Sequence, residues 1–178
     1  MKPACTKICF LLLVLTATIR LPAQDDTLRT KAFDAYWTKP RLVPRAGIAI
    51  QESASAEIGL TYHKILVHPL GLSSVSKYLT GEVIVRDNHV VAGPKAGVEL
   101  TAGLVGFAGD VTYYTDGHVG SFVATPKAGL SIYGFVNLFY GYNFSLSNES
   151  FNYIAHNRFS ITVNFNRDYG DLKDAPRR

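Results

Sequence analysis

The chain has 178 residues, of which 47% are hydrophobic and 18% charged, and its formal net charge is +4. This length is sufficient for one domain and marginal for two. The two cysteines, Cys5 and Cys9, both lie close to the start of the sequence, so the rest of the chain cannot be a disulfide-rich scaffold.

Residues 1–24 have the layout of a secretory signal peptide. Lys2 and Lys7 give a basic start, residues 8–15 form an apolar run, and the small Ala23 precedes an acidic, polar stretch. The run is too short to cross a bilayer as a helix, so we predict cleavage at the end of this segment. Three of the 18 basic residues lie in it, and its removal leaves 15 basic against 14 acidic residues. This near balance argues against a nucleic-acid-binding surface.

Residues 25–43 are polar, lack a regular pattern and are interrupted by Pro40. We expect them to form a periplasmic lead-in, because their composition offers little apolar surface to bury. Tyr36 and Trp37 leave a second possibility open, in which this segment occupies the mouth of the folded domain.

From Pro44 onwards, apolar side chains alternate with polar or small ones, and turn signals recur at short intervals. A side-chain period of two is typical of β-strands whose two faces meet different environments. The pattern predicts an all-β domain over residues 44–166, followed by a polar tail over residues 167–178. We place eight strands at about 45–52, 55–63, 78–87, 91–102, 105–115, 120–132, 135–146 and 156–166. The long connection at 64–77 either extends the flanking strands or folds over the barrel mouth.

The sequence of one hairpin occurs twice in the chain. The sequence PKAGVEL at 94–100 returns as PKAGLSI at 126–132, and in both copies the even-numbered residues are apolar. Each copy is followed by a tight turn, at Gly103 or Gly134, and by a returning strand. Both copies open with a proline on the apolar face. Because proline removes a ladder hydrogen bond, we expect these prolines to lie near a rim.

The residues on the two faces indicate which face points outward. A soluble barrel would carry many Lys, Glu and Ser residues on its outside, whereas here the polar face is mostly small residues with isolated charges. Small residues suit the crowded lumen of an eight-stranded barrel, and large apolar residues suit lipid. We predict a lumen network of four acidic and four basic residues, paired because an unpaired buried charge is unfavourable. Its members are Glu57, Glu82, Arg86, Lys95, Glu99, Asp110, Lys127 and Arg158.

The connections have two lengths. The turns at Gly103 and Gly134 are short, whereas the alternate connections at 115–120 and 147–157 are longer and polar. With its strand number and repeated hairpin, the chain resembles the small OmpA/OmpX-like outer-membrane β-barrels of Gram-negative bacteria. The resemblance implies an eight-stranded antiparallel up-and-down transmembrane β-barrel, a multi-pass protein of the cell outer membrane in contact with lipid and lipopolysaccharide. It also implies that the barrel-assembly machinery recognises an aromatic strand end, for which Phe165 is the candidate.

Catalytic and cofactor motifs do not emerge from the pattern, and we expect no cofactor. His89, His118 and His156 fall in three outward loops, where they are either a metal site or solvated side chains. Asp116, His118 and Ser121 supply the residue types of a hydrolase triad, although sequence adjacency is not triad geometry. We expect a non-enzymatic structural or surface-interaction role, with the loops presented to an external partner. The alternatives are a barrel enzyme acting on lipid A or phospholipid and a secreted soluble ligand-binding barrel.

Overall fold

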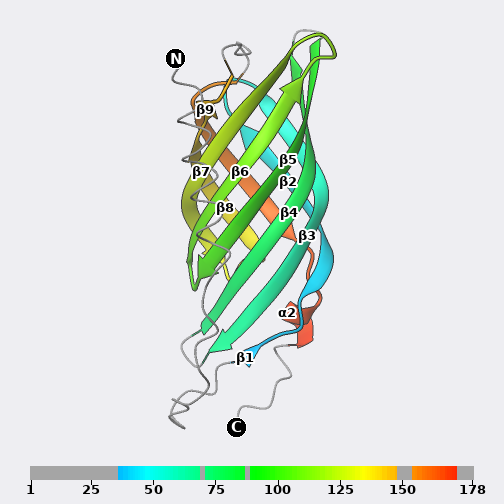
Figure 1. Ribbon diagram of the computed structural model, residues 1–178. Coiled ribbons are helices and arrows are strands. Elements are labelled where there is room, and N and C mark those ends of the chain that lie inside the picture. Colours follow the sequence, from blue (N-terminus) through cyan, green and yellow to red (C-terminus); the bar gives the residue numbers. More distant parts are fainter. Residues whose placement is uncertain (1–35, 69–70, 87–88, 148–153, 172–178) are drawn as a thin grey trace, which may run out of the picture. The chain divides into compact units, whose positions relative to one another are not determined.

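The computed structural model describes residues 36–68, 71–86, 89–147 and 154–171, all within the compact unit Asp34–Arg178. The predicted signal peptide lies outside the described residues. The eight long strands (Figure 1) are β2 (Arg41–Ile50), β3 (Ala54–His68), β4 (Gly71–Arg86), β5 (His89–Ala102), β6 (Val105–Thr115), β7 (Gly120–Ile132), β8 (Val136–Tyr142) and β10 (Asn157–Asn164). Two short strands, β1 (Tyr36–Trp37) and β9 (Phe144–Ser145), and one helical turn, α2 (Asp168–Asp171), accompany them.

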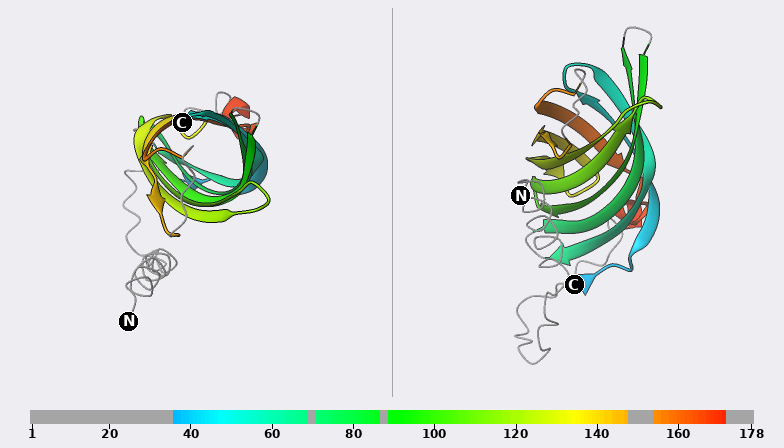
Figure 2. Two further views of the ribbon diagram at one scale, coloured as in Figure 1. Left: turned by 90° about the horizontal axis from the view of Figure 1, so that it is seen from above. Right: turned by 45° about the horizontal axis from the view of Figure 1, so that its top comes forward.

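The strands close on themselves. Each long strand pairs antiparallel with its neighbours in the order β3-β2-β10-β8-β7-β6-β5-β4, and β4 pairs back onto β3. Figure 2 shows the resulting ring from above. A closed ring leaves no long strand with a free edge. The predicted all-β, eight-stranded antiparallel up-and-down barrel is therefore confirmed.

Along most of the wall, apolar side chains point outward, and most of the charged side chains point inward. On the outer face, Val98 is 47% exposed and Leu130 is 62% exposed. On the inner face, the charged residues of the same two strands are buried, since Glu99 is 0% exposed and Lys127 is 6% exposed. The strand period of two explains this contrast, because consecutive side chains lie on opposite sides of the wall. The predicted direction of the two faces is confirmed.

The long connection at 64–77 extends the flanking strands. Pairing between β3 and β4 runs without interruption from Ser55 opposite Ile84 to His68 opposite Gly71. The resulting long hairpin projects at the lower end of the barrel as drawn in Figure 1, the end that also carries β1 and α2.

The wall begins earlier than expected, inside the segment predicted as a lead-in. β2 starts at Arg41, and β1 pairs with the projecting part of β3, with Trp37 opposite Leu66. Between β1 and β2, the three residues 38–40 face only two residues of β3. This is a β-bulge, a position that accommodates Pro40 because a bulged residue need not donate to the ladder.

The two repeated prolines have the same effect on the sheet. Pro94 lies on the outer face and pairs with Gly81 of β4, but the β5–β6 ladder skips two pairs between Ala92 and Lys95. At Pro126, the ladder to the next strand again skips two positions, which divides the predicted seventh strand into β8 and β9. Proline has no N–H to donate, so each copy of the repeat interrupts the ladder toward the following strand.

Short turns lie at the lower end of the barrel. β5 and β6 are joined by residues 103–104, and Gly103 has a positive φ of 61° that favours glycine. β7 and β8 are joined by residues 133–135, where Tyr133 and Gly134 have positive φ values of 55° and 82°. The connections at the upper end include residues 51–53 and 116–119.

Candidate functional site: the charged interior of the barrel

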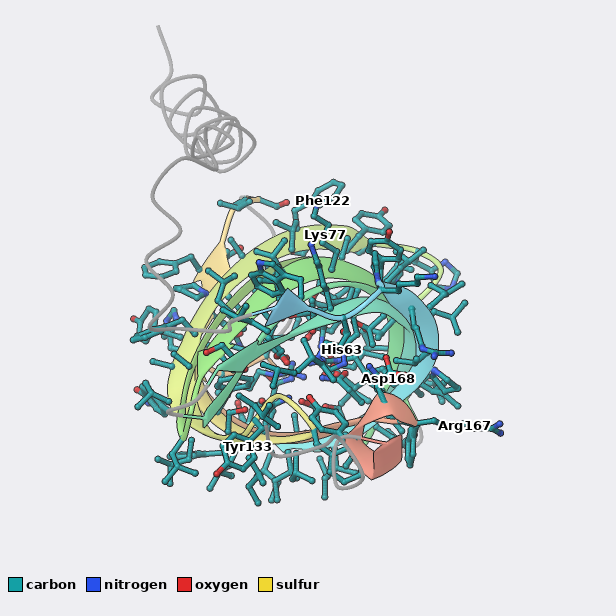
Figure 3. All side chains as sticks on the ribbon, turned by 90° about the horizontal axis from the view of Figure 1, so that it is seen from below. His63, Lys77, Phe122, Tyr133, Arg167 and Asp168 are labelled. Carbon is teal, nitrogen blue, oxygen red and sulfur yellow. The ribbon has the colours of Figure 1, made fainter. Side chains whose placement is uncertain are left out.

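Eight charged side chains from seven strands converge in the interior. They are Arg45, Glu57, Glu82, Lys95, Glu99, Asp110, Lys127 and Arg158, and each is no more than 6% exposed. Four are acidic and four are basic, so the described interior is electrically balanced apart from the buried His63. Figure 3 shows, from below, that side chains with nitrogen and oxygen atoms gather inside the ring while many other side chains radiate outward.

Lys95 lies at the centre of the first group of contacts. Glu57 and Glu82 occupy directly opposite positions on β3 and β4, where two like charges repel each other. Lys95 resolves this conflict because its Nζ contacts Glu82 and lies 2.7 Å from Oε2 of Glu57. Arg158 of β10 adds a further pair, with its Nη1 at 2.8 Å from Oε1 of Glu82. The contacts therefore cross the lumen between distant strands.

Arg45 organises a second group nearer the lower end. Its Nη1 lies 2.9 Å from Glu99 Oε2 and donates a hydrogen bond of 2.9 Å to Asn164 Oδ1. Its Nε is 3.4 Å from Glu57, which links this group to the first. The guanidinium also stacks on the ring of Tyr78, with its central carbon 4.1 Å from the ring centroid.

Polar neighbours add hydrogen bonds to some of these pairs. The other oxygen of Glu99 accepts hydrogen bonds from the side-chain amides of Asn137, at 2.9 Å, and Asn164, at 3.2 Å. Asp110 forms an ion pair with Lys127 and accepts a hydrogen bond of 2.8 Å from the Tyr78 hydroxyl. Buried ion pairs of this kind are stable only when hydrogen bonds satisfy their remaining polar atoms.

The structure places seven of the eight predicted charges in the interior. The exception is Arg86, at the upper end of β4, whose side-chain position lies outside what the structure describes. Sequence reasoning missed Arg45. The alternation of side chains could have placed Arg45 inside, because Arg45 is in phase with Gly47 and Ala49 and out of phase with the outward Ile48.

The lumen is also filled at both ends. At the upper end, four buried side chains, those of Ile84, Val91, Tyr114 and Val123, form an apolar cluster against which Ile154 packs. We call this group the upper apolar cluster.

At the lower end, α2 lies against the barrel mouth. The Tyr169 hydroxyl donates a hydrogen bond of 2.5 Å to the Tyr133 carbonyl oxygen, and its ring lies 5.8 Å from that of His63. Burial raises the pKa of the Tyr169 phenol, and the negative charges of Glu99 and Asp168 raise it further. Asp168 in turn pairs with Arg41, at 2.7 Å.

Asp116, His118 and Ser121, which supply the residue types of a hydrolase triad, do not come together as one. Asp116 Oδ1 accepts backbone hydrogen bonds of 2.9 Å from both His118 and Val119, while Ser121 is buried and faces the lumen. Of the three histidines predicted to lie in outward loops, His118 and His156 are exposed, whereas His89 is the first residue of β5. The side chain of the third, His89, is not described. Within the ranges that the structure covers, no group of three or more His, Cys, Asp or Glu side chains could hold a metal ion.

The arrangement is that of a filled barrel in which ionic contacts join opposite sides of the wall. Among the helices of the described chain, none has the length and apolar character required to cross a bilayer. Comparison with protein families, with curated proteins and with solved structures finds no match for this chain.

Proposed function

We propose that the chain is an integral outer-membrane β-barrel with a structural or surface-interaction role and no catalytic activity, exported through the signal peptide at residues 1–24. The observation that carries this proposal is the reversal of the usual burial pattern. Water-soluble proteins bury apolar groups and expose charges, whereas here the wall exposes apolar groups and buries charges. Contact with hydrocarbon stabilises this arrangement, and contact with water does not.

The height of the apolar surface supports the same proposal. On β7, every outward residue from Phe122 to Ile132 is apolar. Ten residue steps cover about 33 Å along a strand. At a strand tilt of about 40° this corresponds to about 25 Å along the barrel axis, which is the height of the apolar band in outer-membrane barrels.

The filled interior argues against two other roles. A soluble barrel that binds an apolar ligand needs an apolar cavity, but the ion pairs of Lys95 and Arg45 occupy the centre of this lumen. The same side chains stand where a pore would need water. We therefore expect a barrel that anchors and stabilises the envelope rather than one that conducts solutes.

The two ends of the barrel suggest its orientation. Outer-membrane barrels have short turns at the periplasmic side and longer loops outside. The turns at 103–104 and 133–135 would then face the periplasm, and the loops at 116–119 and after β9 would face lipopolysaccharide and an external partner. Phe165 follows β10 at the lower end and is half exposed, which suits recognition by the barrel-assembly machinery.

The membrane assignment is tested by substituting an outward residue. Ile161 is exposed in the middle of β10, and Ile161→Lys in lipid is expected to oppose insertion by about 2–4 kcal/mol. The measurement is the fraction of barrel that inserts into vesicles, read from its different gel migration before and after boiling. The matched control, Val119→Lys, places the same group in an exposed loop and should insert normally.

Two results would overturn this proposal. One is a wild-type protein that carbonate washing releases from membranes, together with an Ile161→Lys variant that folds normally in buffer. The other is a change in the acylation of lipid A, or in phospholipid hydrolysis, when the gene is deleted and restored, which would favour the enzyme alternative.

A further inference from the structure

Among the strand residues whose side chains the structure describes, charge on the outer face is confined to one place. Among the described side chains on the outward face of the strands, the charged ones are Lys64 of β3 and Lys77 of β4. Arg41, at the start of β2, is in phase with the inward residues and pairs with Asp168. Figure 3 shows Lys77 on the outside of the ring, with His63 on the inside.

The two lysines are neighbours. Tyr62 lies opposite Lys77, and Lys64 lies opposite Val75, so the lysines are diagonal partners on one face of adjacent strands. Residues in this relation are roughly 7–8 Å apart, and their Cβ atoms are somewhat closer. The carboxylates of the described strands are all on the other side of the wall, in the interior. Two positive charges therefore stand side by side on an apolar surface.

Two aromatic residues border this pair. The Nζ atom of Lys64 lies 4.7 Å from the ring centroid of Trp37, which β1 holds against β3 on the outer face. Tyr62 is half exposed beside Lys77. Trp, Tyr and Lys are the residues that anchor proteins at the boundary between hydrocarbon and lipid headgroups. All four residues belong to the β3–β4 hairpin or to β1, which project at the lower end.

We infer that Trp37, Tyr62, Lys64 and Lys77 form a binding site for the phosphate of an anionic phospholipid in the leaflet at the lower end of the barrel. Such a phosphate would relieve the repulsion between the lysines, and its acyl chains would lie on Leu79 and Leu60 above them. This inference rests on the proposed membrane location, because a lipid can reach the site only if the wall lies in a bilayer.

The chain carries its own reporter for this site. Trp37 is the single tryptophan in the sequence, and bromine on a lipid chain quenches tryptophan fluorescence only at short range. The full chain is reconstituted in phosphatidylcholine vesicles that contain a small fraction of brominated phosphatidylglycerol, or the same fraction of brominated phosphatidylcholine. For the wild type, we expect stronger quenching by brominated phosphatidylglycerol, and we expect salt to reduce the difference.

Single substitutions test the two lysines. Lys64→Gln and Lys77→Gln should each reduce the preference for phosphatidylglycerol about fivefold, and the double variant should abolish it. Arg167→Gln is the matched control, because it removes one positive charge from the lower end at an exposed position away from Lys77 (Figure 3). It should leave the preference unchanged.

The outcomes separate the two proposals. Equal quenching by both brominated lipids would overturn the lipid site while leaving the membrane location intact. A preference that Arg167→Gln reduces as much as Lys77→Gln would also overturn it, since the effect would then come from net charge. Absence of quenching by either lipid would overturn the membrane location itself.

Discussion

The middle of the lumen and its upper end are filled in two different ways. In the middle, charged groups such as Lys95 and Glu82 depend on particular partners at short distances. At the upper end, Ile84 and Val91 belong to a cluster whose contacts have no direction. Loss of one charge leaves its partners unpaired, whereas loss of one methyl group leaves a small gap. A small chemical change should therefore be far more damaging in the middle than at the end.

The largest effect is expected for Lys95→Met. The substitution keeps the length of the side chain but leaves Glu57 and Glu82 opposite each other without the ammonium group between them. Breaking a buried ion pair by removing one partner destabilises by about 3–5 kcal/mol. The measurement is the free energy of unfolding of the refolded barrel in vesicles, from reversible urea titration.

A double variant shows whether balance is the cause. Glu57→Gln combined with Lys95→Met removes one charge of each sign and leaves three of each among the described interior groups. We expect it to be more stable than Lys95→Met alone, because fewer charges remain unpaired. If the two substitutions simply add, the interior charges do not act as a network.

The second effect concerns Tyr114, which belongs to both regions. Its ring is part of the upper apolar cluster, while its hydroxyl donates a 3.1 Å hydrogen bond to Glu82 and accepts one of 3.0 Å from Arg158. Tyr114→Phe keeps the ring and removes both hydrogen bonds. We expect a loss of about 2 kcal/mol in the free energy of unfolding, intermediate between the two regions. A neutral result would show that apolar packing alone determines the contribution of this residue.

Much of this architecture was predictable from the alternation of side chains. That period placed Glu57, Lys95 and Lys127 inside, because a strand with two unlike environments allows only one phase. The alternation could not predict which interior charges pair with each other. Arg45 meets Glu99, 54 positions away, because the stagger of the closed barrel brings β2 and β5 across the lumen from each other.

The alternation of side chains did not predict strands where the wall extends beyond its apolar band. In the segment 64–77, outward Lys64 and Lys77 accompany inward Ile65, so the contrast between the faces disappears. A pattern that depends on two unlike environments cannot mark a strand whose sides are alike. The split between β8 and β9 was also missed, since it results from Pro126 on the neighbouring strand.

The third prediction concerns the contribution of the upper apolar cluster alone to the free energy of unfolding. Ile84→Val removes one methylene from a side chain that is 1% exposed, and we expect a loss of about 1 kcal/mol. The same change at Ile48, on the outer wall, should have a smaller effect because that side chain is 56% exposed. An effect of Ile84→Val as large as that of Lys95→Met would reverse the ranking of the two regions.

The smallest effect is expected for a substitution in the exposed turn at 116–119, beyond the upper apolar cluster. Hydrogen bonds from the N–H groups of Val119 and His118 hold the pKa of the Asp116 carboxyl below its usual value. A lowered pKa means that ionised Asp116 favours the ordered turn above its unfolded pKa, and that this contribution is lost as pH falls through the folded value. Asp116→Asn should therefore speed hydrogen exchange of the Val119 amide at neutral pH, with a difference that shrinks in acid. The urea midpoint of the barrel should not move, because a solvent-exposed turn is not coupled to the charges that fill the lumen. A shifted midpoint would instead extend the cooperative unit from the lumen into the loop.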